Sequence, residues 1–173
     1  MITLFPGDFN TVSQIFYDRV LEKVQIHRLS CPCCGHSGCL TIHGYYTRKV
    51  RTPGGIVSIR ILRVKCSCGK THSVLLASMI PYSQIRLADM ISVIMSEDDP
   101  ASSVSLQLSI PDISTSLIQR IRKNFHRHWE QRILSIGISL GSPATLSSSC
   151  LRVFGRQFMQ IRCTVNGLLT FPT

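Results

Sequence analysis

The chain has 173 residues, of which 44% are hydrophobic, and it carries a formal net charge of +10 at pH 7. This hydrophobic content supports a packed core and argues against global disorder, while the positive charge favours a polyanionic partner such as nucleic acid. No stretch approaches the ~20 uninterrupted apolar residues that span a bilayer, and the N-terminus lacks the features of a secretory signal. We therefore expect a cytoplasmic protein made of two small domains, with no membrane partner.

An amphipathic helix is predicted over residues 10–26, behind Asn10-Thr11, which can cap it. We assign residues 1–28 to this N-terminal helical segment and expect its role to be packing. The hydrophobic residues that recur at helical spacing are Val12, Ile15, Phe16, Val20, Leu21 and Val24.

Two groups of cysteines follow, CPCCG at residues 31–35 and CSCG at residues 66–69, and each ends in a glycine that can take a tight turn around a metal. In a reducing compartment, thiols crowded in this way are better explained by metal ligation than by disulfides. Four thiolates close the coordination shell of Zn²⁺, so we predict a structural zinc site rather than a catalytic one. The predicted ligands are Cys31, Cys34, Cys66 and Cys68.

The spacing of the second pair leaves the fourth ligand open. Two residues separate Cys31 from Cys34, which is a usual zinc-binding spacing, but a single residue separates Cys66 from Cys68. The alternative ligands are His72, Cys33 and Cys39. A second interpretation is that these cysteines are buried free thiols of a small core, although thiols this close would oxidise easily without a metal.

The segment between the cysteine groups predicts β-strands. We expect a strand pair at Leu40–His43 and Tyr45–Val50, a turn at Thr52–Gly55 and a long strand at Ile56–Lys65. In the long strand, the alternating residues are Val57, Ile59 and Ile61 on one side and Ser58, Arg60 and Leu62 on the other. Residues 29–80 together predict a small zinc ribbon.

This ribbon is strongly basic, because no acidic residue occurs between Glu22 and Asp89. Aromatic rings in it can stack on bases or sugars while Lys and Arg neutralise phosphates, or they can cover the ribbon core beside simply solvated charges. Consecutive tyrosines face opposite sides of a strand, so both interpretations can hold together. The predicted nucleic-acid-binding residues of the ribbon are Tyr45, Tyr46, Arg48, Lys49, Arg51 and Arg60.

A helix-turn-helix-like domain of three helices is predicted over residues 82–136. The helices are expected at Leu87–Met95, at Ala101–Ser109 and over about residues 113–135. The residues expected to point inward are Val104 and Leu108 in the second helix and Ile113, Leu117, Ile118, Ile121, Phe125, Trp129 and Ile133 in the third.

The third helix also carries a basic face opposite its apolar one. A helix with a dry stripe and a basic stripe can enter the major groove of DNA, and any solvated surface helix has the same pattern. The predicted nucleic-acid-binding residues of this helix are Arg120, Lys123 and Arg127.

The remaining segment, residues 137–173, is predicted to be a Gly/Ser-rich linker, from 137 to 149, followed by a C-terminal tail. The predicted fold class is therefore α+β. It consists of an N-terminal helix, a zinc-ribbon β module and a helix-turn-helix-like domain.

Three motifs carry a resemblance to a known family: CPCCG at 31–35, HGYYTR at 43–48 and RVKCSCGKTH at 63–72. Over about residues 25–135, the chain resembles a bacterial domain-of-unknown-function family associated with transposase-like proteins. It is also similar in plan to the zinc-binding and helix-turn-helix heads of insertion-sequence transposases. The resemblance implies zinc binding by the four predicted cysteines and DNA binding by analogy.

Such transposases also carry a nuclease domain, which we do not expect here. Metal-dependent strand transfer needs several carboxylates gathered on a sheet-based fold to hold paired cations. The chain has nine acidic residues, of which three lie together at 97–99 and none follows residue 135. We therefore expect no enzymatic activity and no small-molecule substrate; a thiol-redox or metal-dependent enzyme would need a reactive thiolate or an open metal position.

The sequence thus favours a non-enzymatic, zinc-binding and DNA-binding protein that is transposon-associated or regulatory. The alternative is an interaction module whose ribbon and helices bind another protein, such as a transposase. Basic residues on both the ribbon and the third helix favour the first function.

Overall fold

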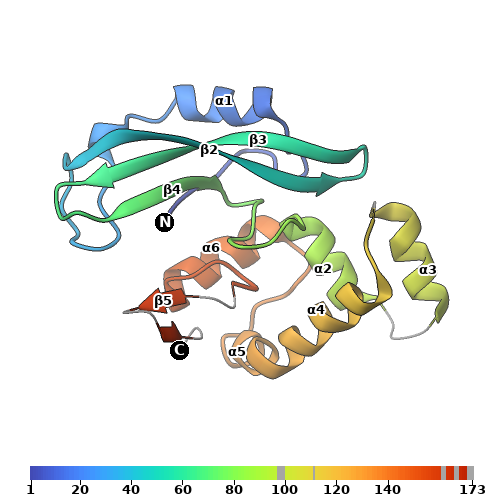
Figure 1. The fold of residues 1–173 in the computed structure, drawn as a ribbon. Coiled ribbons are helices and arrows are strands. Elements are labelled where there is room, and N and C mark those ends of the chain that lie inside the picture. The colour runs from blue at the N-terminus through green and yellow to red at the C-terminus, as the bar shows by residue number, and fades with distance from the viewer. Residues whose placement is uncertain (97–99, 111, 161–162, 166–167, 171–173) are drawn as a thin grey trace.

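A four-stranded sheet lies between helix α1 (Gln14–Glu22) on one side and a group of helices on the other (Figure 1). The fold is therefore mixed α+β, as predicted, with several helices after the sheet. The computed structural model describes residues 1–96, 100–110, 112–160, 163–165 and 168–170. Within these ranges, no helix combines the length and the apolar character that crossing a membrane requires.

The sheet has the strand order β1-β4-β3-β2, in which β1 is parallel to β4 and the other neighbours are antiparallel. Its strands are β1 (Ile2–Leu4), β2 (Leu40–Thr52), β3 (Gly55–Cys66) and β4 (Thr71–Leu76). The turn predicted at residues 52–55 joins β2 to β3. In contrast, the two strands expected at 40–43 and 45–50 are one strand, because a bulge between Ile42 and Gly44 lets β2 continue. Strand β1 was not predicted.

Helix α1 is shorter than the helix predicted over residues 10–26. Its N-cap is Ser13, whose hydroxyl accepts a hydrogen bond from a backbone N–H of the first turn at 3.2 Å. The predicted cap Asn10-Thr11 therefore lies outside the helix. Ile15, which was expected to pack, is 66% exposed, whereas Tyr17 is fully buried. A short 3-10 helix, η1 (Ile26–Arg28), follows.

The hydroxyl of Tyr17 lies where the hydrogen-bond ladder between β3 and β4 ends. The last paired residues on that side are Arg63 and Ser73. Beyond them, the hydroxyl accepts a hydrogen bond from the Leu62 N–H at 2.9 Å and donates one to the Val74 carbonyl at 2.8 Å. Burial raises the pKa of Tyr17, so the hydroxyl keeps the proton that it donates. One side chain thus replaces a rung of the ladder and connects α1 to two strands.

Five further helices follow in the described part of the chain. They are α2 (Leu87–Met95), α3 (Pro100–Ser109), α4 (Thr115–His128), α5 (Glu130–Ser135) and α6 (Pro143–Phe154). Helix α2 has the predicted bounds. The helix expected over about 113–135 is divided into α4 and α5 at Trp129, whose backbone leaves the helical conformation at φ −123°. After α6, the strands β5 (Cys163–Val165) and β6 (Leu168–Thr170) pair with each other.

The linker predicted at residues 137–149 is wrong for its second half, which belongs to α6. Ser142 caps this helix by accepting a backbone hydrogen bond at 3.4 Å, and Gly155 ends it with φ +63°. Leu146 and Cys150 are fully buried. The serine-rich composition concealed an apolar face whose residues are four apart.

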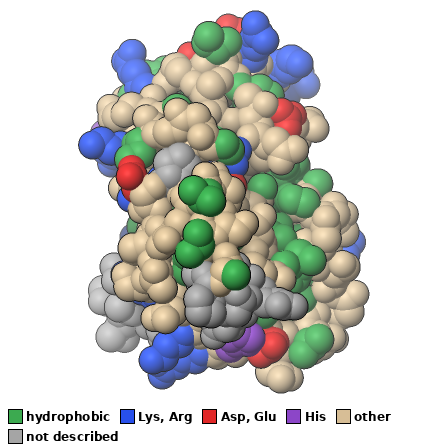
Figure 2. All heavy atoms as spheres, turned by 90° about the vertical axis from the view of Figure 1, so that its right-hand side faces the viewer, with side chains coloured by type: hydrophobic (Ala, Val, Ile, Leu, Met, Phe, Trp, Pro, Cys, Tyr) green, Lys and Arg blue, Asp and Glu red, His purple; other side chains and the backbone are tan. Residues whose placement is uncertain are grey.

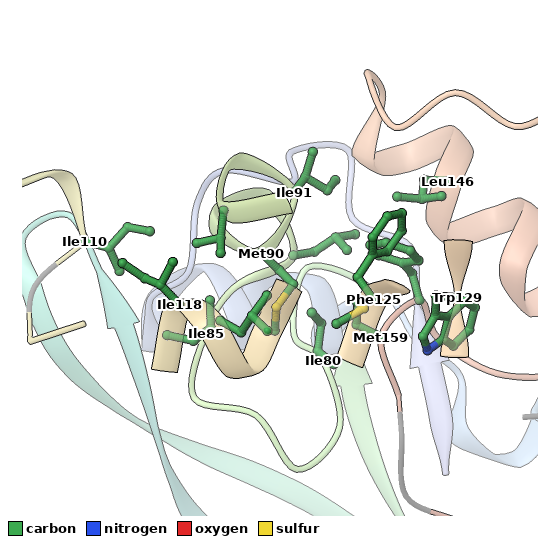
Figure 3. Packing of buried hydrophobic residues seen from close by; sticks show 14 of the residues in the cluster. Ile80, Ile85, Met90, Ile91, Ile110, Ile118, Phe125, Trp129, Leu146 and Met159 are labelled. Atoms are coloured by element: carbon green, nitrogen blue, oxygen red, sulfur yellow. The ribbon is translucent and has the colours of Figure 1, made fainter. Parts of the chain in front are cut away.

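The helices share one hydrophobic core, to which α2, α4, α6 and the loop after β4 contribute (Figure 3). Trp129 is fully buried in this core. Its ring meets the rings of Phe154 and Phe158 edge to face, at centroid distances of 5.8 and 5.3 Å. The residue at which the predicted third helix breaks is therefore also a main packing residue.

Helix α3 presents a different face to this core from the one predicted. Val104 and Leu108, expected inward, are 55% and 85% exposed, whereas Leu106 is buried. The helix has few apolar residues, so its spacing alone did not define which face packs.

The loop between β4 and α2 joins the sheet to the helices. The Ala77 N–H donates to the Leu4 carbonyl of β1 at 2.7 Å, and the Ala77 carbonyl accepts a hydrogen bond from the Gln157 amide beyond α6. At the start of α2, the buried Arg86 guanidinium donates to both carboxylate oxygens of Asp89 at 2.6 and 2.7 Å. Segments from three regions of the chain therefore meet at this loop.

The bridging role of Tyr17 is testable by Tyr17→Phe. This change removes the hydroxyl and leaves a buried N–H and a buried carbonyl without a partner, so we expect the free energy of unfolding to fall by about 1–3 kcal/mol. Urea denaturation followed by circular dichroism measures it. Tyr45→Phe is the matched control, since that ring is partly exposed, and it should change stability by less than about 0.5 kcal/mol. Equal stability of the two variants would contradict the bridge.

Candidate metal centre

Four thiols meet at the end of the β2–β3 hairpin. The sulfur atoms of Cys31, Cys34, Cys66 and Cys68 all lie within 4.8 Å of one another. Cys34 Sγ is 3.6 Å from Cys66 Sγ, and Cys31 Sγ is 3.9 Å from Cys68 Sγ. A tetrahedral ion with Zn–S bonds of about 2.3 Å has S–S edges of about 3.8 Å, so this spacing fits. The predicted cluster could therefore hold a metal ion such as zinc.

The two cysteine turns are closed by the same kind of hydrogen bond. The Gly35 N–H donates to the Cys31 carbonyl and the Gly69 N–H to the Cys66 carbonyl, both at 2.9 Å. The two glycines have φ values of +74° and +84°, which cost glycine little. The second turn is one residue shorter than the first and still closes, which explains how the single-residue spacing brings Cys68 to the cluster.

The sheet fixes the position of one sulfur, and the turns bring in the others. Cys66 is the last residue of β3 and is paired with Leu40, the first residue of β2. Cys31 and Cys66 are buried, Cys34 is half-buried and Cys68 is exposed. The two buried cysteines pack in a hydrophobic cluster with residues of all four strands. The candidate site thus lies at the rim of the sheet, with one side open to solvent.

Backbone N–H groups surround the two buried sulfurs. The N–H groups of Cys34 and Cys33 donate to Cys31 Sγ and lower the pKa of this thiol to about 7. The Cys68 N–H donates to Cys66 Sγ at 3.4 Å and lowers the pKa of Cys66 to about 6. Such hydrogen bonds favour the thiolate, which is the form that binds metals.

The three alternative ligands have different positions. Cys39 Sγ is 3.1 Å from Cys66 Sγ, which is closer than two sulfur ligands of one tetrahedral zinc ion lie. His72 is buried, with Nε2 3.3 Å from Cys31 Sγ, and neither residue belongs to the group of mutually close ligand atoms. Cys33 is exposed. His72 thus has the place of a hydrogen-bond partner that orients a ligand.

The three sheet arginines that were predicted to bind nucleic acid all contact other groups of the protein. Arg60 lies over the ring of Tyr45, 4.3 Å from its centroid. The Arg48 guanidinium donates to two carbonyls of the loop between β4 and α2. Arg51 pairs with Asp112 at 3.5 Å. These three side chains therefore have structural contacts in addition to any role in binding.

The other two predicted residues of the sheet differ from each other. Tyr46 packs against the hydrophobic cluster between α1 and the sheet, whereas Lys49 is exposed. Tyr46 and its neighbour Tyr45 thus have different surroundings, as expected for consecutive residues of a strand.

Helix α4 uses one arginine internally and exposes its other cations. Arg122, which the sequence analysis did not single out, is buried and donates to the carbonyls of Val93 and Ser96, both at 3.3 Å. There it satisfies carbonyl groups that the end of α2 leaves without helical partners. Its position, four residues after Ile118 and three before Phe125, was the available signal. The exposed cations are Arg120, Lys123 and Arg127.

Residues 31–121 match the family described as Domain of unknown function (DUF6431), and this match spans more than half of the 173 residues. The chain belongs to the DUF6431 family. The DUF6431 match begins at the first candidate ligand and ends within α4, so it includes both cysteine turns and the whole β2–β3 hairpin. Neither the curated proteins nor the solved structures gave a match. The DUF6431 description names no function, and the relation to transposase heads stays a prediction.

The metal site is testable by Cys34→Ser. Removing one of four thiolates should strongly weaken metal binding, so we expect about one zinc ion per wild-type chain and little zinc in the variant. Native mass spectrometry of protein purified under reducing conditions measures this. Cys33→Ser is the matched control, because Cys33 is adjacent in sequence but its thiol is exposed and lies outside the cluster. Wild-type protein without bound metal would contradict the site.

The fourth ligand is tested by comparing Cys68→Ser with His72→Ala in cobalt-substituted protein. Sulfur-to-cobalt absorption grows with the number of thiolate ligands, so we expect Cys68→Ser to reduce it by about a quarter. His72→Ala should leave its intensity nearly unchanged, since the histidine orients a ligand without binding the ion. The opposite pattern would make His72 the fourth ligand.

Proposed function

We propose that this chain is a non-enzymatic DNA-binding protein in which a structural zinc ion holds the sheet and helix α4 contacts DNA. The observation that carries the proposal is the exposed basic face of α4. Arg120, Lys123 and Arg127 are three and four residues apart, so they lie on one side of the helix. Exposed cations in this arrangement neutralise phosphates along a groove.

The surrounding helices support a helix-turn-helix function for α4. Residues 110–114 separate α3 from α4, the two helices contact each other, and α2 also packs on α4. In helix-turn-helix proteins the second helix of such a pair enters the major groove while the first crosses the backbone. Arg120 lies in the N-terminal half of α4, the part of a recognition helix that approaches base edges.

The distribution of acidic residues supports a non-enzymatic role. Among the described residues, the four cysteines are the only group of metal-ligating side chains close enough to hold an ion together. Three acids of the helical half are separately paired: Asp89 with Arg86, Asp112 with Arg51 and Glu130 with His126. Among the described residues, no cluster of carboxylates corresponds to the one that metal-dependent strand transfer requires. Four thiolates, in turn, favour a structural role for the zinc ion.

One observation favours the alternative, a protein-binding module. Val104 and Leu108 are exposed and lie one turn apart on α3. Figure 2 shows hydrophobic side chains at the surface of the helical half on this side, while Lys and Arg lie mostly around the sheet half. Exposed apolar residues of this kind can contact a partner protein. Two side chains are a weaker signal than the basic face of α4.

The DNA-binding role of α4 is testable with the triple variant Arg120→Ala, Lys123→Ala and Arg127→Ala. If each cation neutralises a phosphate, the slope of log K against log salt should become less steep by about 2–3. Fluorescence anisotropy with a labelled random duplex across a salt series measures affinity and slope. Alanine favours helix, so the fold should be retained.

A matched control removes the same charge elsewhere. Arg19, Lys23 and Arg28 are exposed near α1, and their triple alanine variant lowers the net charge equally. We expect this control to keep most of the wild-type salt slope. Equal losses in both triple variants would mean that net charge alone drives binding, and α4 would then not be the interface.

A further inference from the structure

Two hollows adjoin each other, one against the sheet and one beside α4, and residues 81–84 line both of them. The first, of about 570 Å³, is bounded by β2, β3 and β4. The second, of about 540 Å³, is bounded by the end of β2 and by α4. Both volumes fall within the range of small-molecule sites in proteins. The loop before α2 thus forms a ridge between two concave surfaces.

Tyr82 lies on this ridge and is 75% exposed, although its backbone is in the left-handed region at φ +62°. This conformation is unfavourable for a bulky residue and persists only where its surroundings enforce it. Here β2 provides the restraint. Arg48 donates to carbonyls on both sides of Tyr82, those of Ile80 and Ser83, and the Arg51 N–H donates to the Gln84 carbonyl at 2.8 Å. The ring is therefore presented to solvent by a loop that the sheet holds in place.

The unusual backbone conformations gather around the second hollow. Among the described residues, the non-glycine residues with positive φ are Tyr82, Asp112 and Met159. Tyr82 and Met159 line this hollow, and Asp112 pairs with Arg51, which also lines it. Strained residues concentrate at binding sites, where the fold maintains them at a cost. Their location makes this surface a candidate binding site.

The charge of the two hollows favours an anionic ligand. Lys49 and Arg63 line the first hollow and Arg120 lines the second, and none of the three has an ion-pair partner in the described part of the chain. No described carboxylate lines either hollow. Cations on both sides of an exposed aromatic ring form the combination that binds single-stranded nucleic acid, with phosphates on the cations and a base on the ring.

The two hollows and the ridge at Tyr82 together form what we call the cleft. We propose that this cleft binds single-stranded nucleic acid, with one base stacked on Tyr82. The adjoining phosphates would lie beside Lys49 and Arg63 on one side and beside Arg120 on the other. The inference deepens the proposed function and rests on it for nucleic acid as the partner. It also assigns duplex and single-stranded nucleic acid to different surfaces of the protein. The exposed face of α4 at Lys123 and Arg127 suits a duplex groove, and Arg120 borders both surfaces, whereas hollows of this size admit single nucleotides and exclude a duplex.

The test is Tyr82→Gly, measured by fluorescence anisotropy with labelled oligothymidylate, oligouridylate and a random duplex. Glycine accepts φ +62° without strain, so the loop should keep its shape while the ring is lost. Loss of one stacked base should weaken single-strand binding about 5- to 100-fold. Duplex binding should stay within about twofold. Single-stranded DNA and RNA both offer phosphates and a base that can stack on Tyr82. The ratio of the affinities for oligothymidylate and oligouridylate therefore shows which of the two the protein prefers.

Two further variants separate stacking from other effects. Tyr82→Phe keeps the ring and should retain single-strand affinity. Phe5→Ala removes an exposed aromatic ring that lines neither hollow, and it should also leave affinity unchanged. Lys49→Ala, by contrast, should weaken single-strand binding and reduce its salt slope by about 1.

The outcomes distinguish this inference from the proposed function. If Tyr82→Gly binds single strands as well as wild type, or if poly-glutamate competes for the cleft as effectively as oligothymidylate, the single-strand site is wrong. In the same experiment, duplex binding that responds to the α4 triple variant would leave the proposed function standing. Single-strand binding that depends on Tyr82, without duplex binding, would place the interface in the cleft alone. Failure to bind any oligonucleotide would overturn both.

Discussion

A metal ion in the sulfur cluster would constrain the register of strands β2 and β3. Strands β2 and β3 are joined by a two-residue turn at one end and meet at the cysteine turns at the other, where Cys66 is opposite Leu40. A slip of one residue would exchange the faces of every side chain between them. A metal held by Cys31 and Cys34 before β2, by Cys66 at the end of β3 and by Cys68 after it would resist such a slip. Together with the two-residue turn, a metal at this site would help to fix the position of each basic residue along the hairpin.

This register extends to the helices through the loop before α2. Arg48 and Arg51 of β2 bind carbonyls of that loop, β1 binds its first residue, and Gln157 reaches it from beyond α6. The same loop contributes Ile80 and Ile85 to the helical core, which contains the fully buried Trp129. Sheet and helices are thus connected by polar contacts made by a few side chains, as well as by hydrophobic packing. The cleft around Tyr82 lies at this junction, and its shape depends on both halves.

Local signals in the sequence predicted the parts of the fold that short segments determine. The cysteine turns, the turn at 52–55 and the bounds of α2 each depend on neighbouring residues, and all are present. Tyr17 was missed because its partners are 45 and 57 residues away, and no spacing rule connects them. Helix α6 was missed because composition outweighed periodicity. The cleft could not be predicted, since it needs the hairpin, the loop and α4 placed together.

The place of β2 at the free edge of the sheet has a consequence of its own. An edge strand presents unpaired backbone groups to which a second chain can add, and proteins prevent this with lysine, arginine and bulges. Strand β2 carries all three: a bulge near its start, and Arg48, Lys49 and Arg51 near its end. The charges that we propose for contact with nucleic acid therefore also repel another copy of the hairpin. If the proposed nucleic-acid contact is correct, protection of this edge and binding of the nucleic acid use the same side chains.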